Sequence, residues 1–267
     1  MSKDLDGDVV LVTGGAAGVG KALALEAARR GAKVVLADIA DAESAVAELR
    51  TLGGSAEWIR TDMRNFAEAE AAVSFAQDRF GRLNVLCNNA GMGVGGGLHE
   101  VDPEQAKAVF DLNVLGLFHG IRAAAAALIA SAAAGQSAYL LNTGSEHSLG
   151  VPPYVTPISI YTASKYAALG LTDTARRDLG PLGVSVSLLA PGWVLTENVQ
   201  NFIKASPEFA AAVSPYAQKA STVARLAFDG LLAGRHVILT NGASQEFARE
   251  RLAALSRDID ALPSTSQ

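Results

Sequence analysis

Short apolar runs rich in β-branched residues recur along the chain, and a segment with helical periodicity follows each of them. The first run, Val9-Val-Leu-Val-Thr13, is typical of a strand buried on both faces. We expect strands at residues 9–13, 33–38, 56–60, 84–88, 138–142, 184–190 and 236–240. Periodicity predicts helices at residues 18–30, 41–52, 66–80, 103–134, 162–179, 207–219, 221–233 and 245–262. This alternation predicts an α/β fold with a parallel, doubly wound sheet flanked by helices.

The 267 residues contain no linker, no internal repeat and no low-complexity block beyond the alanine-rich stretches. One domain over residues 1–267 is therefore a better interpretation than two small ones. Within it we expect residues 195–220 to form a lid over the substrate and residues 244–262 to form a C-terminal helix.

The composition suits a filled globular core, with 49% apolar and 18% charged residues. A net charge of −5 and the lack of a basic run argue against nucleic acids and membranes as partners. The most apolar helical stretch, residues 123–134, is too short to span a bilayer. The first eight residues lack the basic and apolar regions of a signal peptide. We expect a soluble, cytoplasmic protein.

The residues that bind metals or form disulfides are few. The single cysteine, Cys87, excludes an internal disulfide. The four histidines are scattered and show no metal-ligand spacing, so no metal site is expected: His99, His119, His147 and His236.

A glycine-rich turn, Thr13-Gly-Gly-Ala-Ala-Gly-Val-Gly20, joins the first strand to the first helix. Glycines allow the backbone to turn tightly and to approach a ligand closely. The N-terminus of the helix offers free N–H groups and a positive dipole end to a pyrophosphate. The spacing differs from the common dinucleotide fingerprint, but its strand–turn–helix context favours nucleotide binding over a turn without a ligand.

Asp38 ends the second strand, where a carboxylate can accept hydrogen bonds from the hydroxyls of an adenosine ribose. The same charge repels the 2′-phosphate of NADP, and no Lys or Arg lies at residues 14–20 or 39–40 to bind that phosphate. NAD is therefore favoured, with an aspartate that only caps a turn as the alternative. Asp62, after the third strand, either reaches the adenine amino group or serves in a plain turn.

Tyr161 and Lys165 lie four residues apart in a segment that continues as a helix, so both side chains share one helix face. A free phenol has a pKa near 10, and a nearby positive charge lowers it. A tyrosine tuned in this way can exchange a proton with an alcohol or a carbonyl oxygen. Alone, this spacing is common, and a half-buried ring beside a solvated charge is the ordinary alternative.

Further polar residues stand where a ligand would lie. Residues 88–91, Asn-Asn-Ala-Gly, follow the fourth strand and can line a nucleotide cleft. Asn113 lies inside a long helix, where asparagine is a mediocre choice, either to hold a water or a lysine or as a surface amide. Ser145 follows the fifth strand and can bond a substrate oxygen, although loop serines usually serve in turns.

In their order and spacing these motifs resemble those of the short-chain dehydrogenase/reductase family, in its single-domain branch. The resemblance covers about residues 7–200, or reaches 240 with the last strand, and includes Pro191-Gly-Trp-Val-Leu-Thr196. It implies a Rossmann-type fold and reversible alcohol–carbonyl chemistry, for which Asp38 favours NAD as cofactor. The implied cofactor-binding residues are Gly14, Ala17, Gly18, Val19, Gly20, Asp38, Asp62, Met63, Asn89, Ala90, Gly91, Tyr161, Lys165, Pro191, Gly192, Val194 and Thr196.

The resemblance also implies roles for the polar residues. Tyr161 resembles the acid/base, and Lys165 the residue that binds the nicotinamide ribose and lowers the pKa of the tyrosine. Ser145 corresponds to the residue that orients the substrate oxygen, with Ser148 as its competitor. Asn113 corresponds to the anchor of a proton-relay water. The loop from Pro191 to Thr196 resembles the one beside the nicotinamide carboxamide.

Two departures from the family pattern matter. The segment between Ser145 and Tyr161 is long and contains prolines, so we expect it to reshape the entrance for the substrate. The usual ending, a strand with an Asp-Gly-Gly turn, is replaced by Asn241-Gly-Ala and another helix. That ending often packs across a tetramer interface, so a homodimer is favoured, with a tetramer possible.

The expected pocket is aromatic and apolar, which favours a hydrophobic or ring-bearing small-molecule substrate. His147, Tyr154 and Trp193 are expected to contact the substrate, and other rim candidates are residues 93–98, Glu146, Phe202, Phe209 and Tyr216. Two other functions are weighed. A cofactor-binding regulator has no need for an intact Asn–Ser–Tyr–Lys set, and a lyase or epimerase usually has a larger substrate domain.

Overall fold

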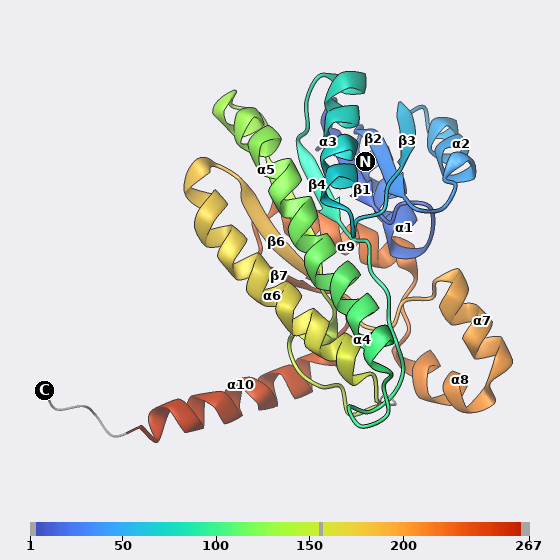
Figure 1. Ribbon diagram of the computed structural model, residues 1–267, viewed down its shortest axis with the longest axis vertical. Helices are drawn as coiled ribbons and strands as arrows, with labels where there is room; N and C mark the ends of the chain where they lie inside the picture. Colours follow the sequence, from blue (N-terminus) through green and yellow to red (C-terminus); the bar gives the residue numbers. More distant parts are fainter. Residues whose placement is uncertain (1–3, 155–156, 263–267) are drawn as a thin grey trace, which may run out of the picture.

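A computed structural model describes residues 4–154 and 157–262. Seven strands form one parallel sheet in the order β3-β2-β1-β4-β5-β6-β7 (Figure 1). Their bounds are β1 Val9–Thr13, β2 Lys33–Asp38, β3 Ala56–Arg60, β4 Val85–Asn88, β5 Tyr139–Thr143, β6 Ser185–Ala190 and β7 Val237–Leu239. This sheet confirms the predicted parallel, doubly wound architecture.

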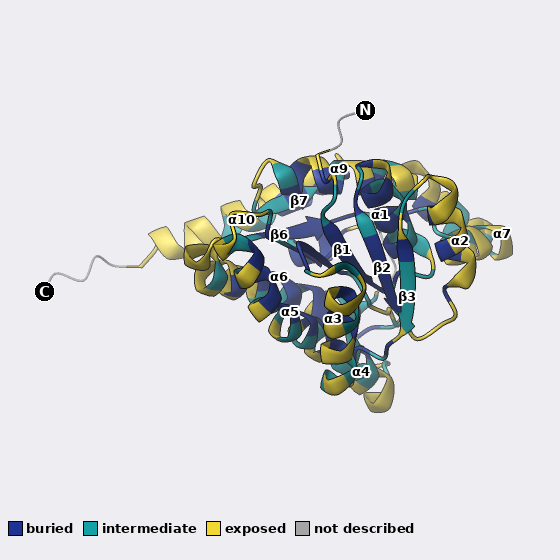
Figure 2. Cartoon of the chain, turned by 90° about the horizontal axis from the view of Figure 1, so that it is seen from above, coloured by how far each residue is buried: buried dark blue, intermediate teal, exposed yellow. Residues whose placement is uncertain are grey.

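Helices cover both faces of the sheet. As a result, every residue of β1 is buried, although successive residues face opposite sides. Val10 and Val12 pack in one core with α1 Gly18–Arg29, α2 Glu43–Thr51 and α9 Ala220–Leu232. Val9 and Leu11 pack in the other core, with α3 Phe66–Phe80, α5 Leu117–Ala133 and α6 Ser159–Leu179. Figure 2 shows the buried strands between two layers of half-exposed helices.

The long helix expected at residues 103–134 is continuous but not uniform. It consists of α4 Pro103–Phe110, a π turn at Asp111–Gly116 and then α5. Asp102 caps its start, where its side chain accepts from the N–H groups of Glu104 and Gln105. The π turn contains Asn113 and was not expected from the sequence, which predicted one uniform helix.

By length and composition, Pro103–Ala133 is apolar enough to cross a membrane, which corrects the expectation that this region is too short. Core helices of water-soluble proteins meet the same test, and Ala124 and Leu128 of this helix are buried in the core beside the sheet. The expected cytoplasmic location stays a prediction.

The region after β6 differs most from the expected elements. Instead of one helix at residues 207–219, there are α7 Glu197–Ala205, α8 Pro207–Val213 and a 3₁₀ turn at Ser214–Tyr216. The Thr196 and Ser206 side chains cap α7 and α8, and Pro207 starts α8. These helices stand beside the carboxyl ends of the strands (Figure 1), as a lid would.

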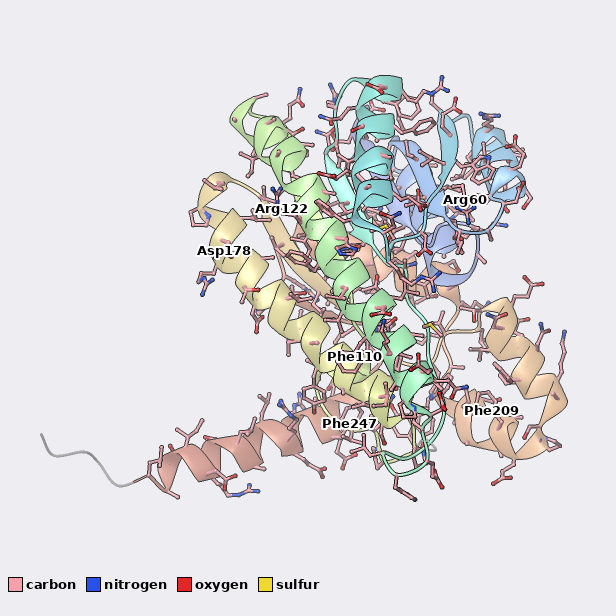
Figure 3. The ribbon with its side chains drawn as sticks, in the orientation of Figure 1. Arg60, Phe110, Arg122, Asp178, Phe209 and Phe247 are labelled. Carbon is pink, nitrogen blue, oxygen red and sulfur yellow. The ribbon has the colours of Figure 1, made fainter. Side chains whose placement is uncertain are left out.

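Two other helices have bounds that matter below. α6 begins at Ser159, three residues earlier than expected, so Tyr161 lies in its first turn. The last helix, α10 Ser244–Asp260, extends away from the sheet (Figure 1). Figure 3 labels Phe247 near the base of α10 and Phe209 on the lid helix α8.

Candidate active site

The glycine-rich turn lies at the point where the sheet order reverses between β1 and β4, which is where open α/β sheets bind ligands. Gly14 and Gly18 have φ values of 64° and 58°, a region that favours glycine. A Cβ on Gly20 would lie 1.9 Å from the Gly14 carbonyl oxygen. The side-chain amide of Asn89 donates to the carbonyls of Thr13 and Gly14 at 3.1 and 3.3 Å, which holds the turn against β4.

Asp38 lies beside this turn. Its Oδ2 accepts a hydrogen bond from the Ala16 N–H at 2.8 Å, and its Oδ1 accepts one from the Ala40 N–H at 2.9 Å. The carboxylate therefore shapes the turn in addition to facing the cavity that a nucleotide would occupy. Each carboxylate oxygen can accept a further hydrogen bond, so these contacts leave capacity for a ribose.

Asp62 lines the same cavity, but its carboxylate is engaged by Arg64. The Arg64 Nε lies 2.9 Å from Oδ1, and a guanidinium NH₂ group lies 2.6 Å from Oδ2. Hydrogen bonding from Arg64 is the main reason that the pKa of Asp62 is lowered. No sequence pattern indicated this ion pair. Arg64 places a positive charge beside Asp62 in the part of the cavity where the adenine was expected to bind.

Asn113 connects the π turn to the segment after β4. Its Oδ1 accepts from the Met92 N–H at 2.8 Å, and its Nδ2 donates to the Met92 carbonyl at 2.8 Å and to Ser164 Oγ at 3.0 Å. Each polar atom of this buried amide thus has a protein partner. The amide thereby fastens Met92 to α6, and its expected role as the anchor of a relay water stays a prediction.

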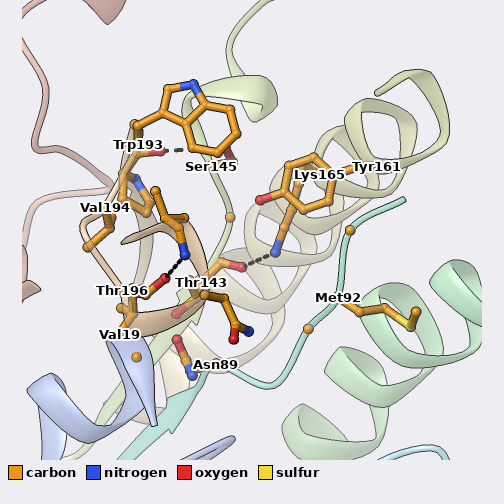
Figure 4. Close-up of a pocket in the computed structure, with 18 of the residues that line it drawn as sticks. Val19, Asn89, Met92, Thr143, Ser145, Tyr161, Lys165, Trp193, Val194 and Thr196 are labelled. Atoms are coloured by element: carbon orange, nitrogen blue, oxygen red, sulfur yellow. Dashed lines mark hydrogen bonds between the residues drawn. The ribbon is translucent and has the colours of Figure 1, made fainter. Parts of the chain in front are cut away.

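Tyr161 and Lys165 lie on the same face of α6 as predicted, with Lys165 Nζ 5.4 Å from the centroid of the tyrosine ring (Figure 4). The ammonium donates to the Thr143 carbonyl at 2.9 Å. Burial lowers the pKa of Lys165 to about 8. The bond to Thr143, 22 residues earlier in the sequence, fixes the ammonium between the end of β5 and the tyrosine ring.

Burial raises the pKa of Tyr161, and a hydrogen bond with Ser145 acts in the opposite direction. This direction is the reverse of the lowering that the sequence predicted from Lys165. The reason is geometric, because the ammonium lies over the ring and is bonded to Thr143. In the protein alone, loss of hydration around the phenol therefore outweighs the nearby charge.

Ser145 and Ser148 have different environments. Ser145 starts a 3₁₀ turn, Glu146–Ser148, and its Oγ lies 3.4 Å from the Pro191 carbonyl. Ser148 is fully buried, and its Oγ accepts the Ser145 N–H at 3.2 Å. Of the two serines, Ser145 is the one that lines a cavity with Tyr161, while Ser148 stabilises the turn.

Two cavities receive nearly all of the predicted cofactor residues. One, of about 420 Å³, holds the reactive pair, and the other, of about 460 Å³, holds Asp38. Of the predicted cofactor residues only Gly20 lines neither, because it packs inside the turn. The first is lined by Ala17, Gly18, Val19, Asn89, Gly91, Tyr161, Lys165, Pro191, Gly192, Val194 and Thr196, and the second by Gly14, Ala17, Asp38, Asp62, Met63, Ala90 and Gly91.

A third cavity, of about 560 Å³, adjoins the reactive pair. Ser145 and Tyr161 belong to both this cavity and the first, so the two spaces meet at these hydroxyls. His147 and Trp193 line it as predicted, and Trp193 contacts the lid ring Phe209 edge-to-face with centroids 5.4 Å apart. The sequence analysis did not identify Ile158, Asn198 and Val199 as lining residues. A predicted helix at residues 197–205 would have indicated that Asn198 and Val199 face this cavity.

Tyr154 does not line this cavity, contrary to the expectation that it contacts the substrate. Its hydroxyl donates to Glu146 Oε2 at 2.6 Å, and its ring stacks on Tyr216 with centroids 4.2 Å apart. Ser244, at the start of α10, donates to the same Glu146 oxygen at 2.5 Å. Tyr154 and Tyr216 thus form a support behind the cavity, and Leu98, another rim candidate, is 74% exposed.

The proline-containing segment between Ser145 and Tyr161 is described except for residues 155 and 156, so its predicted role at those positions lies outside the described residues. Its end is tied to the loop after β4, where the Gly96 N–H donates to the Pro157 carbonyl at 2.8 Å. Over residues 4–154 and 157–262, no group of three or more His, Cys, Asp or Glu side chains is arranged to hold a metal.

Comparison with known proteins agrees with this geometry. The family described as short chain dehydrogenase matches residues 8–206. An A-factor type γ-butyrolactone 1′-reductase (1S-forming) from Streptomyces virginiae is 34% identical over 75% of this chain and 77% of its own. The D-β-hydroxybutyrate dehydrogenase of Cupriavidus necator is 30% identical over 75% and 76%. A crystal structure of a short chain dehydrogenase/reductase from Burkholderia phymatum in complex with NAD covers 99% of both chains, with 31% identity and a TM-score of 0.83. The chain therefore belongs to the short-chain dehydrogenase/reductase family.

Proposed function

We propose that the protein is an NAD-dependent oxidoreductase that interconverts a secondary alcohol and its ketone by hydride transfer. The observation that carries the proposal is that Tyr161 and Ser145 line two adjoining cavities at once. One cavity leads to the glycine-rich turn, and the other is lined by the lid. A proton-transfer group at the meeting point of a cofactor space and a substrate space is what alcohol oxidation requires.

The residues present fit NAD. Gly18 and Val19, at the start of α1, line the first cavity, and the free N–H groups of a helix N-terminus suit a pyrophosphate. Asp38 suits a free ribose rather than a 2′-phosphate, and the nearby Arg64 is already bonded to Asp62. The relative from Burkholderia phymatum, which was solved with NAD, supports the same choice.

NAD, when bound, supplies the hydride acceptor for oxidation, and its reduced form supplies the hydride for reduction. Tyr161 takes the proton of the substrate hydroxyl in oxidation and returns it in reduction, while Ser145 orients the substrate oxygen. Lys165 would hold the nicotinamide ribose from its place beside the Thr143 carbonyl. A relay water at Asn113 would not accept a hydrogen bond from the side chain, because both amide hydrogens are donated to Met92 and Ser164.

An apolar or ring-bearing substrate fits the third cavity. Its aromatic walls are Trp193, Phe202 and Phe209, and neither Lys nor Arg belongs to its described lining. Such a space favours a neutral apolar molecule over a phosphate or carboxylate. The named relatives act on different molecules, a γ-butyrolactone and a hydroxybutyrate, so their substrates are not transferred to this chain.

A panel of secondary alcohols and ketones, followed by NADH absorbance, tests the proposal. Tyr161→Phe keeps the ring but removes the proton-transfer group, so turnover should fall roughly 100- to 10,000-fold while the fold and NAD binding persist. Tyr166→Phe, in the same helix but beside Arg251, is the matched control and should keep its activity. Near-normal turnover by Tyr161→Phe would contradict the proposal and favour a cofactor-binding regulator.

A further inference from the structure

His147 follows Ser145 by two residues and is buried, with 4% of its surface exposed. Its ring lines the substrate cavity and meets the Tyr161 ring edge-to-face, with centroids 5.5 Å apart. The side chain therefore lies against the ring whose hydroxyl carries out the proposed proton transfer. Nothing in the proposed chemistry uses it, because Tyr161 already transfers the proton.

The tautomer of His147 follows from its one hydrogen bond. Its Nδ1 lies 2.8 Å from Thr162 Oγ1, and that hydroxyl donates its own proton to the Ile158 carbonyl at 3.1 Å. Thr162 can then only accept from the ring, so Nδ1 carries the hydrogen. Burial and the nearby Lys165 lower the pKa of His147 to about 4, so the ring is neutral at pH 7.

The remaining nitrogen, Nε2, is consequently a bare acceptor. Among the described residues it has no hydrogen-bond partner, whereas Nδ1 is satisfied. The polar side chains that share this cavity are few: Ser145, Glu146, Tyr161, Asn198 and Trp193, whose indole Nε1 is buried without a hydrogen-bond partner. Because Nε2 is not among the described buried side-chain atoms that lack a partner, it is open to the cavity and can accept a hydrogen bond from a donor on a ligand there. A hydroxyl on the substrate, next to the reacting carbon, is such a donor.

We propose that His147 determines specificity by accepting a hydrogen bond at Nε2 from a second substrate hydroxyl, so that the enzyme favours an aryl or cyclic vicinal diol, and the matching hydroxyketone, over the corresponding mono-alcohol. This inference rests on the proposed function. The second hydroxyl only binds and is neither oxidised nor transferred. A carboxylate at the same position offers no hydrogen at pH 7 and meets a lone pair, so a 2-hydroxy acid is disfavoured.

Three probes with one skeleton test this: 1-phenylethane-1,2-diol, 1-phenylethanol and mandelate. With the wild-type protein and NAD, kcat/KM for the diol should exceed that for 1-phenylethanol by roughly tenfold, as expected for one net hydrogen bond. Mandelate should be the poorest of the three. In His147→Phe the ratio of diol to mono-alcohol should fall to about one.

Thr162 provides a matched pair of variants. Thr162→Val removes the acceptor that fixes the tautomer and should reduce the diol preference, whereas Thr162→Ser keeps the hydroxyl and should retain it. A preference that survives in both His147→Phe and Thr162→Val would overturn the proposal.

A second measurement does not depend on turnover. The ¹⁵N resonance of His147 Nε2, recorded in the protein saturated with NADH, should shift on addition of the diol but not of 1-phenylethanol. If this shift occurs without oxidation of either alcohol, the binding role stands and the proposed oxidoreductase function fails. If both alcohols are oxidised with equal efficiency and Nε2 does not respond, the function stands and the role of His147 is refuted.

Discussion

Asp38 accepts a 2.8 Å hydrogen bond from the N–H of Ala16, so the residue predicted to choose the cofactor also holds the turn that binds its pyrophosphate. Charge and geometry are therefore combined in one side chain. Removing the carboxylate would have two effects at once. The N–H of Ala16 would lose its hydrogen-bond acceptor, and the discrimination between NAD and NADP would change. Substitutions that separate the two effects give a sharper test than deletion alone.

We expect the wild-type protein to prefer NAD over NADP by more than tenfold in kcat/KM, a gap above about 1.4 kcal/mol. Asp38→Asn keeps an oxygen for Ala16 and for the ribose but removes the repulsion, so the gap should narrow with a small loss of NAD affinity. Asp38→Ala should narrow the gap and also weaken NAD binding more strongly. Steady-state kinetics with both cofactors measures this, and equal use of both by the wild type would contradict the NAD assignment.

Gly20 provides a prediction about the turn itself. Alanine there would place its Cβ 1.9 Å from the Gly14 carbonyl oxygen, so the turn must open and stability should fall by about 1–3 kcal/mol. Gly180→Ala is the control, because Gly180 has helical dihedrals and a methyl group there would have nothing within 4 Å. Urea unfolding should show a loss for Gly20→Ala and no loss for Gly180→Ala.

The sheet was predictable because each strand is a short apolar run that stays buried on both faces, as β1 illustrates. The cofactor residues were predictable for a related reason. In a parallel sheet, the residues that follow each strand meet at one edge, which brought Asp38, Asn89 and Ser145 to the same side. The resemblance to a family then supplied roles that spacing alone left open.

Contacts between distant segments were not predictable. Glu146 accepts from Ser244, 98 residues away, and no local pattern indicates that α10 is fastened behind the substrate cavity. Tyr154 donates to the same Glu146 oxygen, which holds its ring behind the cavity instead of in its lining. A lid was expected at residues 195–220, but its division into α7 and α8 was missed because it depends on the caps Thr196 and Ser206.

His147 should make stability depend on pH. Its pKa is about 4 in the folded protein against 6.5 for the free side chain, so the unfolded chain binds the proton more tightly. The stabilisation that comes from keeping His147 neutral is then fully present above pH 6.5, and it is lost as the pH falls toward 4. Between pH 7 and pH 5 the wild type should lose about 2 kcal/mol more than His147→Gln. Unfolding in urea at the two pH values measures this difference, and His99→Gln, at an exposed position, is the control.

The last prediction concerns a homodimer formed through the outer faces of α5 and α6, which lie side by side on the sheet (Figure 1). Small exposed residues on these helices, including Ala126, Ala163 and Gly170, would let two copies approach closely about a two-fold axis. Gly170 has open space around it, so Gly170→Arg should fold normally but block the contact. Gly180→Arg adds the same side chain at an equally open site beyond α6 and should leave the dimer intact. Sedimentation at micromolar concentration should give a dimer for the wild type and Gly180→Arg and a monomer for Gly170→Arg. A monomeric wild type, or a dimeric Gly170→Arg, would exclude this interface.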